Sequence, residues 1–188
     1  WHVEDPSRFG VCGLDDSGMI TKFQEKPEIG TEFSNLINAG CYLIEREVIA
    51  SLSSERHSIE RDVFPEIAKT GKMAGLEFKG YFVDAGTPSS FIEATQVCIS
   101  NKRFADGWSD GENWFFNRNI NTLSQISGSS ISREVSIGNG CKIIDCVILS
   151  GAIIGDDCKL TRCLIGESSR INDNSDISDK VVGHGEII

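Results

Sequence analysis

Beyond residue 118 an aliphatic residue returns at regular steps, and this repeat restricts the folds open to the chain. The steps are six, six and five residues, which gives a period of 17 residues and aligns Ile137, Ile154 and Ile171. A six-residue module with one inward aliphatic side chain describes one flat side of a triangular coil, and three sides complete a turn. The sequence therefore predicts stacked coils whose core forms between neighbours.

Other positions keep the same period and support this interpretation. Ile120 and Ile126 extend the pattern backwards by one coil. The aligned pairs are Gly138 with Gly155, Lys142 with Lys159, Cys141 with Cys158, and Cys146 with Cys163. The repeat resembles the hexapeptide left-handed β-helix, and we expect about four coils over residues 119–188.

The aligned cysteines admit more than one interpretation. Cys141 and Cys158 would lie one strand spacing apart, about 5 Å, a separation that allows a shared metal or a disulfide. No histidine accompanies them, and cysteine is a small residue that suits an inward-facing column. We expect a structural role, because none of the seven cysteines forms a C-x-x-C pair and reduced thiols fit best.

The charge of the chain excludes one class of partner. Eighteen basic and 28 acidic residues give a net charge of −10, so no excess positive charge is available to neutralise a nucleic-acid backbone. No apolar run approaches the roughly 18 residues of a membrane span, and no leader sequence is recognisable. We expect a cytoplasmic protein, and because residue 1 is Trp1 and not Met, we expect a fragment or a processed product.

The first part of the sequence predicts mixed α/β structure. Turn-forming residues 15–18 between two apolar stretches predict a hairpin, and the apolar run 36–44 predicts a buried central strand. Further strands are expected within residues 73–83. Helices are predicted over 45–52, 58–70 and 87–102, the second beginning at a Ser58 cap and ending at Gly71.

The composition changes between the two parts of the chain. Residues 105–118 lack periodicity, so we expect a linker between a domain at residues 1–104 and the β-helix at 119–188. Trp108 and Trp114 flank this stretch, and we expect them to pack at the junction, although aromatic side chains can also stack on a ligand.

Three short motifs carry candidate binding chemistry. Glu25 and Lys26 follow the hairpin; a carboxylate can accept hydrogen bonds from sugar hydroxyls and an ammonium can hold a phosphate, although a surface ion pair is the alternative. Asn38 and Gly40 interrupt an apolar run, and a buried Asn needs partners from backbone or ligand. Asp84 precedes a helix start, where a carboxylate can bind a metal or simply be favoured by the helix dipole.

The order of these motifs resembles one family. The succession is Asp-Pro-Ser-Arg-Phe-Gly-Val (5–11), Phe-x-Glu-Lys-Pro (23–27), Ile-Asn-Ala-Gly-x-Tyr (37–42), Ser-Ile-Glu-x-x-x-Phe-Pro (58–65), Gly-Tyr-Phe-Val-Asp-Ala-Gly-Thr-Pro (80–88), then hexapeptides. It resembles the sugar-1-phosphate nucleotidyltransferases, and among them the mannose-1-phosphate guanylyltransferases. The resemblance implies the C-terminal half of a Rossmann-like nucleotidyltransferase domain followed by a short left-handed β-helix.

The resemblance also implies a reaction and a set of site residues. The reaction would transfer GMP from GTP to mannose 1-phosphate and release pyrophosphate, with magnesium as cofactor. Lys26 and Asp84 would be catalytic, Lys26 binding the phosphate and Asp84 the metal. The remaining substrate-binding residues would be Gly10, Glu25, Asn38 and Gly40, which line the sugar site.

The sequence departs from the family pattern in ways that leave alternatives open. The glycine-rich signature for the nucleoside triphosphate and a second metal-binding aspartate are absent, so we expect the isolated chain to be inactive. A noncatalytic regulatory or binding subunit, or a glucose- or heptose-1-phosphate enzyme, are the alternatives. An acyltransferase activity of the β-helix would need a histidine base, and only His184 lies there. We also expect a homo-oligomer assembled through the β-helix.

Overall fold

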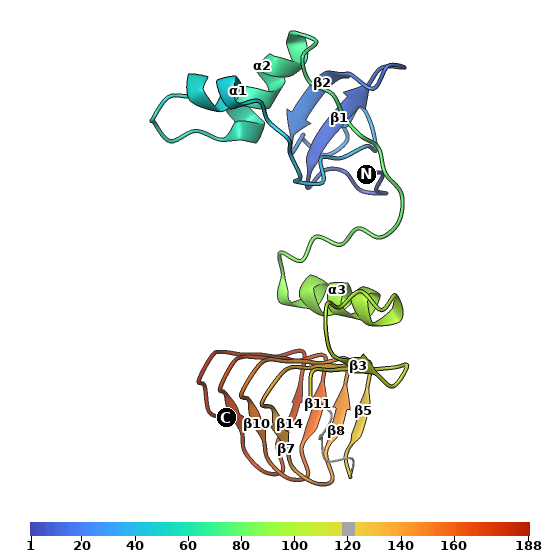
Figure 1. Cartoon of the computed structure of the whole chain (residues 1–188), viewed down its shortest axis with the longest axis vertical. Helices are drawn as coiled ribbons and strands as arrows, with labels where there is room; N and C mark the ends of the chain where they lie inside the picture. The colour runs from blue at the N-terminus through green and yellow to red at the C-terminus, as the bar shows by residue number, and fades with distance from the viewer. Residues whose placement is uncertain (118–122) are drawn as a thin grey trace. The chain divides into compact units, whose positions relative to one another are not determined.

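The structure, a computed structural model, describes residues 1–117 and 123–188. The chain divides into two compact units, Trp1–Phe82 and Val83–Ile188, and each is described by itself (Figure 1). Ile120, predicted to begin the repeat, lies outside the described residues.

The first unit is built around a β-hairpin, as the sequence predicts. Strands β1 (Gly10–Leu14) and β2 (Ile20–Glu25) pair antiparallel, with Gly10 opposite Glu25 at the open end. At the turn, Asp15 accepts backbone hydrogen bonds from Ser17 and Met19, and Gly18 takes a φ of +81° that only glycine adopts freely. These contacts fix the register that brings Glu25 beside Gly10.

Three short helical segments follow the hairpin. They are α1 (Arg46–Ser51), a π-helical turn η1 (Ile59–Val63) and α2 (Phe64–Lys69). Ser58 caps η1 by accepting from the Arg61 N–H, and Gly71 follows the end of α2 at a φ of +67°, as the sequence predicts. The wide π turn lies just before Pro65, whose missing N–H removes one of the hydrogen bonds that would continue a regular α-helix.

Two predicted strand regions are wrong. Residues 36 and 37 form single bridges, to His2 and Val11, but the run does not continue as a strand, and the side chain of Leu43 is fully exposed. Residues 73–83 likewise contribute one bridge, Met19 to Ala74. A strand exists only where a neighbour completes its hydrogen bonds, and no strand among the described residues pairs with the later part of either run.

The second unit begins with the longest helix. In α3 (Pro88–Ser100), Thr87 and Ser90 form a reciprocal capping box and Pro88 occupies the first turn. The Gln96 side chain donates a hydrogen bond to the carbonyl of Gly128, which ties α3 to the coils. The predicted helix start at Thr87 is confirmed.

Stacked coils make up the rest of the second unit (Figure 1). One sheet holds β5 (Gln125–Ser127), β8 (Lys142–Ile144), β11 (Lys159–Thr161) and β14 (Asp176–Ser178); another holds β7 (Ser136–Ile137), β10 (Ile153–Ile154) and β13 (Arg170–Ile171). The third contains β3 (Trp108–Ser109), β4 (Trp114–Phe115), β6 (Ser130–Ile131), β9 (Val147–Ile148), β12 (Leu164–Ile165) and β15 (Val181–Val182). Apart from the β3–β4 pair, neighbouring strands run parallel.

The register of the coils confirms the repeat. Ile154 lies opposite Ile137 on one side and Ile171 on the other, the three residues that the period of 17 aligns. These aliphatic side chains point inward and form the core together with buried cysteines. Cys141, Cys146, Cys158 and Cys163 are all buried there with free thiols, which supports the structural role expected for them.

The stretch expected to act as a linker contains β3 and β4. Trp114 stacks on Phe104 and Trp108 stacks on Phe115, with ring centroids 4.6 and 4.8 Å apart. The domain boundaries at 104 and 118 stay a prediction. Among residues 1–117 and 123–188, no helix combines the length and apolar character that a membrane crossing requires.

Candidate functional site

Three segments of the first unit bring predicted site residues together at the open end of the hairpin. Gly10 lies opposite Glu25, and the Asn38 N–H donates to the Gly10 carbonyl at 2.7 Å. A Cβ placed on Gly10 would lie 2.8 Å from the Glu25 Oε2 atom and 2.7 Å from the Phe23 ring. Only glycine therefore lets the Glu25 carboxylate approach this backbone.

Lys26 marks the end of β2 with an unusual backbone. Its φ is +45°, a left-handed conformation that costs energy for a residue with a side chain. The Lys26 N–H donates to the Phe9 carbonyl at 3.0 Å, which holds the bend. The side chain is 58% exposed, and its Nζ lies 4.0 Å from the Glu25 Oε1 atom. The strand thus ends with a cation free to contact a ligand next to a shielded carboxylate.

Glu25 carries its charge in a sheltered position. Its side chain is only 9% exposed. Burial raises the pKa of the carboxyl above its usual range, and the charge of nearby Glu60 raises it further, while Lys26 and Arg61 oppose both effects. A shielded carboxylate beside a second one gains most from a ligand that donates hydrogen bonds to it.

Asn38 belongs to a hydrogen-bond network that also contains Tyr42 and Glu60. The Asn38 Nδ2 atom donates to the Tyr42 hydroxyl and, at 3.1 Å, to the Glu60 Oε1 atom. Tyr42 donates to the same Glu60 oxygen at 2.6 Å. Burial and then the bond to Glu60 raise the pKa of Tyr42 to about 12, so its hydroxyl keeps the proton that it donates.

The fifth site residue of this unit shapes the loop next to Asn38. Gly40 donates its N–H to the Asn38 Oδ1 atom at 2.9 Å and takes a φ of +76°. This local turn, common for Asn, sets the direction of the chain between Asn38 and Tyr42. Short contacts thus link Gly10, Glu25, Lys26, Asn38 and Gly40.

Sequence reasoning did not select Tyr42 and Glu60 as site residues. The signal was present, because both occur in the quoted motifs Ile-Asn-Ala-Gly-x-Tyr and Ser-Ile-Glu. Glu60 lies 22 positions from Asn38, however, and only the folded chain brings their side chains together.

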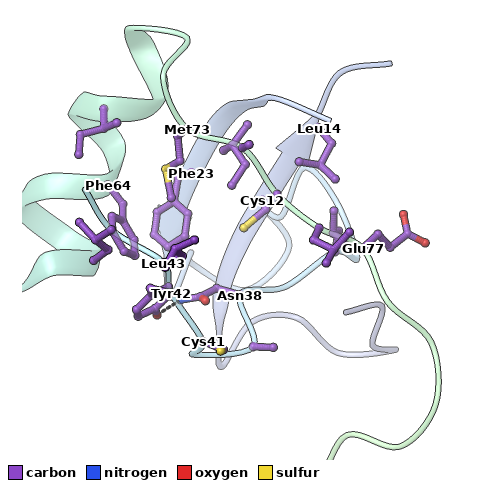
Figure 2. A pocket seen from close by; sticks show the side chains of 18 of the residues that line it. Cys12, Leu14, Phe23, Asn38, Cys41, Tyr42, Leu43, Phe64, Met73 and Glu77 are labelled. Carbon is purple, nitrogen blue, oxygen red and sulfur yellow. Dashed lines mark hydrogen bonds between the residues drawn. The ribbon is translucent and has the colours of Figure 1, made fainter. Parts of the chain in front are cut away.

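A cavity of about 380 Å³ adjoins this polar cluster. Figure 2 shows Asn38 and Tyr42 near Cys41 at one part of its wall, with Phe23, Phe64 and Met73 forming another part. The wall is mostly apolar and includes neither Glu25 nor Lys26. The cavity by itself is therefore a poor match for a charged sugar phosphate, and the polar cluster at its border is the better candidate site.

Asp84 lies in the other unit, exposed, shortly before the α3 cap. Its Oδ1 atom would be 3.2 Å from a Cβ on Gly86, so the turn that follows favours a small residue. Across residues 1–117 and 123–188, no three acidic, histidine or cysteine side chains gather as a metal site. His184 accepts a hydrogen bond from the Glu167 N–H at 2.9 Å, a contact that joins neighbouring coils.

Comparison with known families assigns both parts of the sequence. The nucleotidyl transferase family profile matches residues 1–101, more than half of the chain. The chain belongs to the nucleotidyl transferase family. A GlmU-like C-terminal hexapeptide profile matches residues 117–182, the coils of the second unit. The fold is thus a mixed α/β part of a nucleotidyltransferase domain followed by a β-helix, as the sequence predicts.

Similar proteins carry one recurring name. The chain is 33% identical over 152 residues to a probable mannose-1-phosphate guanylyltransferase 3 of Oryza sativa subsp. japonica, covering 79% of this chain and 42% of that protein. It is 36% identical over 102 residues to the mannose-1-phosphate guanylyltransferase catalytic subunit beta of Drosophila melanogaster, covering 54% and 27%. The Danio rerio subunit beta is 37% identical over 98 residues, covering 52% and 26%. The chain spans less than half the length of these relatives.

Proposed function

We propose that this nucleotidyl transferase chain holds mannose 1-phosphate for GMP transfer from GTP, with release of pyrophosphate. The observation that carries the proposal is the cluster in which Gly10, Glu25, Lys26 and Asn38 meet at the open end of the hairpin. The names of the relatives support mannose and guanine as the sugar and base. As part of this proposal, the protein is cytoplasmic, and the whole protein also binds the nucleotide.

Each residue of the cluster has a role in this proposal. The Lys26 ammonium binds the sugar phosphate, since its exposed side chain can reach a ligand while staying near Glu25. The Glu25 carboxylate accepts hydrogen bonds from sugar hydroxyls. Gly10 lets the Glu25 carboxylate lie against the backbone at the sugar site, and Asn38 and Gly40 line the side of the site.

In the reaction, an oxygen of the sugar phosphate attacks the α-phosphorus of the nucleotide. The new bond joins the two phosphates, the bond to the β-phosphate breaks, and pyrophosphate leaves with its electron pair. Glu25 holds the sugar in position through its hydroxyls, and Lys26 holds the attacking phosphate and balances its negative charge. Magnesium, when bound, would neutralise the nucleotide phosphates; Asp84 would supply one carboxylate, which fits an ion that commonly takes its other ligands from phosphates and water.

Titration calorimetry with the full chain tests this proposal. Mannose 1-phosphate should bind, and Lys26→Ala should weaken binding about 10- to 100-fold, the loss expected for a charge-assisted hydrogen bond of about 1.5–3 kcal/mol. Lys22→Ala is the matched control, because Lys22 lies on the same strand but packs over the Phe33 ring. Equal affinity of the wild-type chain for mannose 1-phosphate and inorganic phosphate would refute the sugar assignment. Equal affinity of Lys26→Ala and the wild type for mannose 1-phosphate would refute the role of Lys26.

We also propose that the β-helix mediates assembly into a homo-oligomer. Its outer surface carries partly exposed aliphatic side chains, including Ile153 and Val181, that a second copy would cover. Sedimentation velocity of the chain should give a mass above that of the monomer, and Ile153→Glu should lower it. A monomer at all concentrations would contradict the proposal.

A further inference from the structure

The Glu60 side chain receives two hydrogen bonds at one oxygen. Asn38 Nδ2 donates to its Oε1 atom at 3.1 Å, and the Tyr42 hydroxyl donates to the same atom at 2.6 Å. An ionised carboxylate only accepts hydrogen bonds. The Asn38 amide must therefore turn its NH2 group, and not its oxygen, toward Glu60.

In this orientation, the Asn38 amide can form only one further kind of hydrogen bond. Its two N–H groups are occupied by Glu60 and by the Tyr42 hydroxyl. Its Oδ1 atom accepts from the Gly40 N–H at 2.9 Å, and a carbonyl oxygen has a second lone pair. What Asn38 can still offer a ligand is thus an acceptor.

The Glu25 and Gly10 oxygens next to Asn38 are hydrogen-bond acceptors as well. The Glu25 carboxylate, 9% exposed, is also an acceptor, and the Gly10 carbonyl already accepts from the Asn38 N–H. Lys26 contributes the positive charge at the edge of the cluster. A ligand that satisfies these groups needs hydroxyl donors on one part and an anion on the other.

We propose that Glu60 is a positioning residue for the sugar site: it fixes the amide of Asn38 so that the site presents acceptors and selects ligands that donate hydroxyl hydrogen bonds. The inference builds on the proposed function, because it concerns how the same site chooses its sugar. Glu60 acts through Asn38 and touches no ligand itself.

Substituting Glu60→Gln tests this role. Glutamine can donate as well as accept, so residue 60 no longer dictates the orientation of the Asn38 amide, which then depends on the Gly40 N–H alone. The assay compares mannose 1-phosphate with deoxyfluoro analogues in which one hydroxyl at a time is replaced by fluorine, which cannot donate. The wild-type chain should favour the parent sugar by about 10-fold over the most affected analogue, as expected for the loss of one hydrogen bond, and Glu60→Gln should reduce that preference to about threefold or less.

Two controls separate positioning from a general structural effect. Glu66→Gln removes an exposed carboxylate of α2 that pairs with Lys69, and it should leave the preference unchanged. In an Asn38→Ala background, Glu60→Gln should cause no further loss of preference, because a residue that acts through another is not additive with it. An additional loss there would show that Glu60 contacts the ligand directly and would overturn the proposal.

The possible outcomes distinguish the two claims. If the wild-type chain binds no mannose 1-phosphate, the proposed function fails and this inference fails with it. If the wild type binds and Glu60→Gln keeps the full preference for the parent sugar, the inference alone fails. Should Glu60→Gln not fold, nuclear Overhauser effects from the Asn38 Nδ2 protons to the Tyr42 ring in the unmodified chain decide the orientation. Their absence would overturn the proposal.

Discussion

Replacing Leu160 by alanine should destabilise the β-helix more than any surface change of the same size. Leu160 lies in β11 with no exposed surface, between Ile143 of one coil and Ile177 of the next. The substitution removes three buried carbon atoms, and each loses about 0.8 kcal/mol of burial free energy. The cavity that remains between the neighbouring coils adds a further cost. The expected loss of stability is about 3–5 kcal/mol.

Native-state amide hydrogen exchange measures this loss in the second unit alone. A loss of about 3 kcal/mol should speed exchange of the slowest coil amides more than 100-fold, since about 1.4 kcal/mol corresponds to a factor of ten. Ile187→Ala is the matched control, because Ile187 pairs with Arg170 of β13 in the same unit while 66% of its surface is exposed. Equal acceleration in the two variants would refute the assignment of the inward columns.

Three further predictions follow from backbone and charge. Gly166→Ala should destabilise the coils because its Cβ would lie 2.6 Å from the backbone of Gly183, whereas Gly183→Ala in the last coil meets only a side chain at 3.3 Å; thermal melts compare the two. Lys26→Gly should weaken phosphate binding yet stabilise the fold by about 1 kcal/mol, measured by urea unfolding, because glycine accepts the φ of +45°. The pKa of Glu25 is raised in the folded chain above its usual value of 4.5, so protonation of Glu25 stabilises the fold below pH 4.5, and this stabilisation is lost as pH rises through the folded pKa. Glu25→Gln should therefore reduce the fall in unfolding free energy between pH 4.5 and the folded pKa. The same pH dependence in the variant and the wild type would contradict this.

The β-helix was predictable from sequence because each coil contacts only its neighbours. A period in the sequence then becomes a period in space, as Ile137, Ile154 and Ile171 show. The hairpin and the α3 start were predictable for a related reason: the Asp15 turn and the Thr87 cap are satisfied by residues a few positions away. Local contacts leave local signatures.

The errors concern structure that depends on distant partners. Apolar residues near Leu43 match a central strand by composition, but strand formation depends on neighbouring backbone that composition does not reveal. The site shows the same limit. Glu25, Lys26 and Asn38 were selected from motif order, whereas Glu60 was not, because its contact with Asn38 spans 22 positions. The roles of all these residues stay predictions, including that of Asp84, which lies in the second unit.

A chemical-shift titration of the ¹⁵N-labelled chain with mannose 1-phosphate tests the central claim most directly. We expect shifts concentrated at the amides of Gly10, Glu25, Lys26, Asn38 and Gly40, with inner coil amides such as that of Ile154 unaffected. Inorganic phosphate should move Lys26 alone among them. Saturating mannose 1-phosphate that moves none of these amides, or moves only those of the coils, would contradict the account.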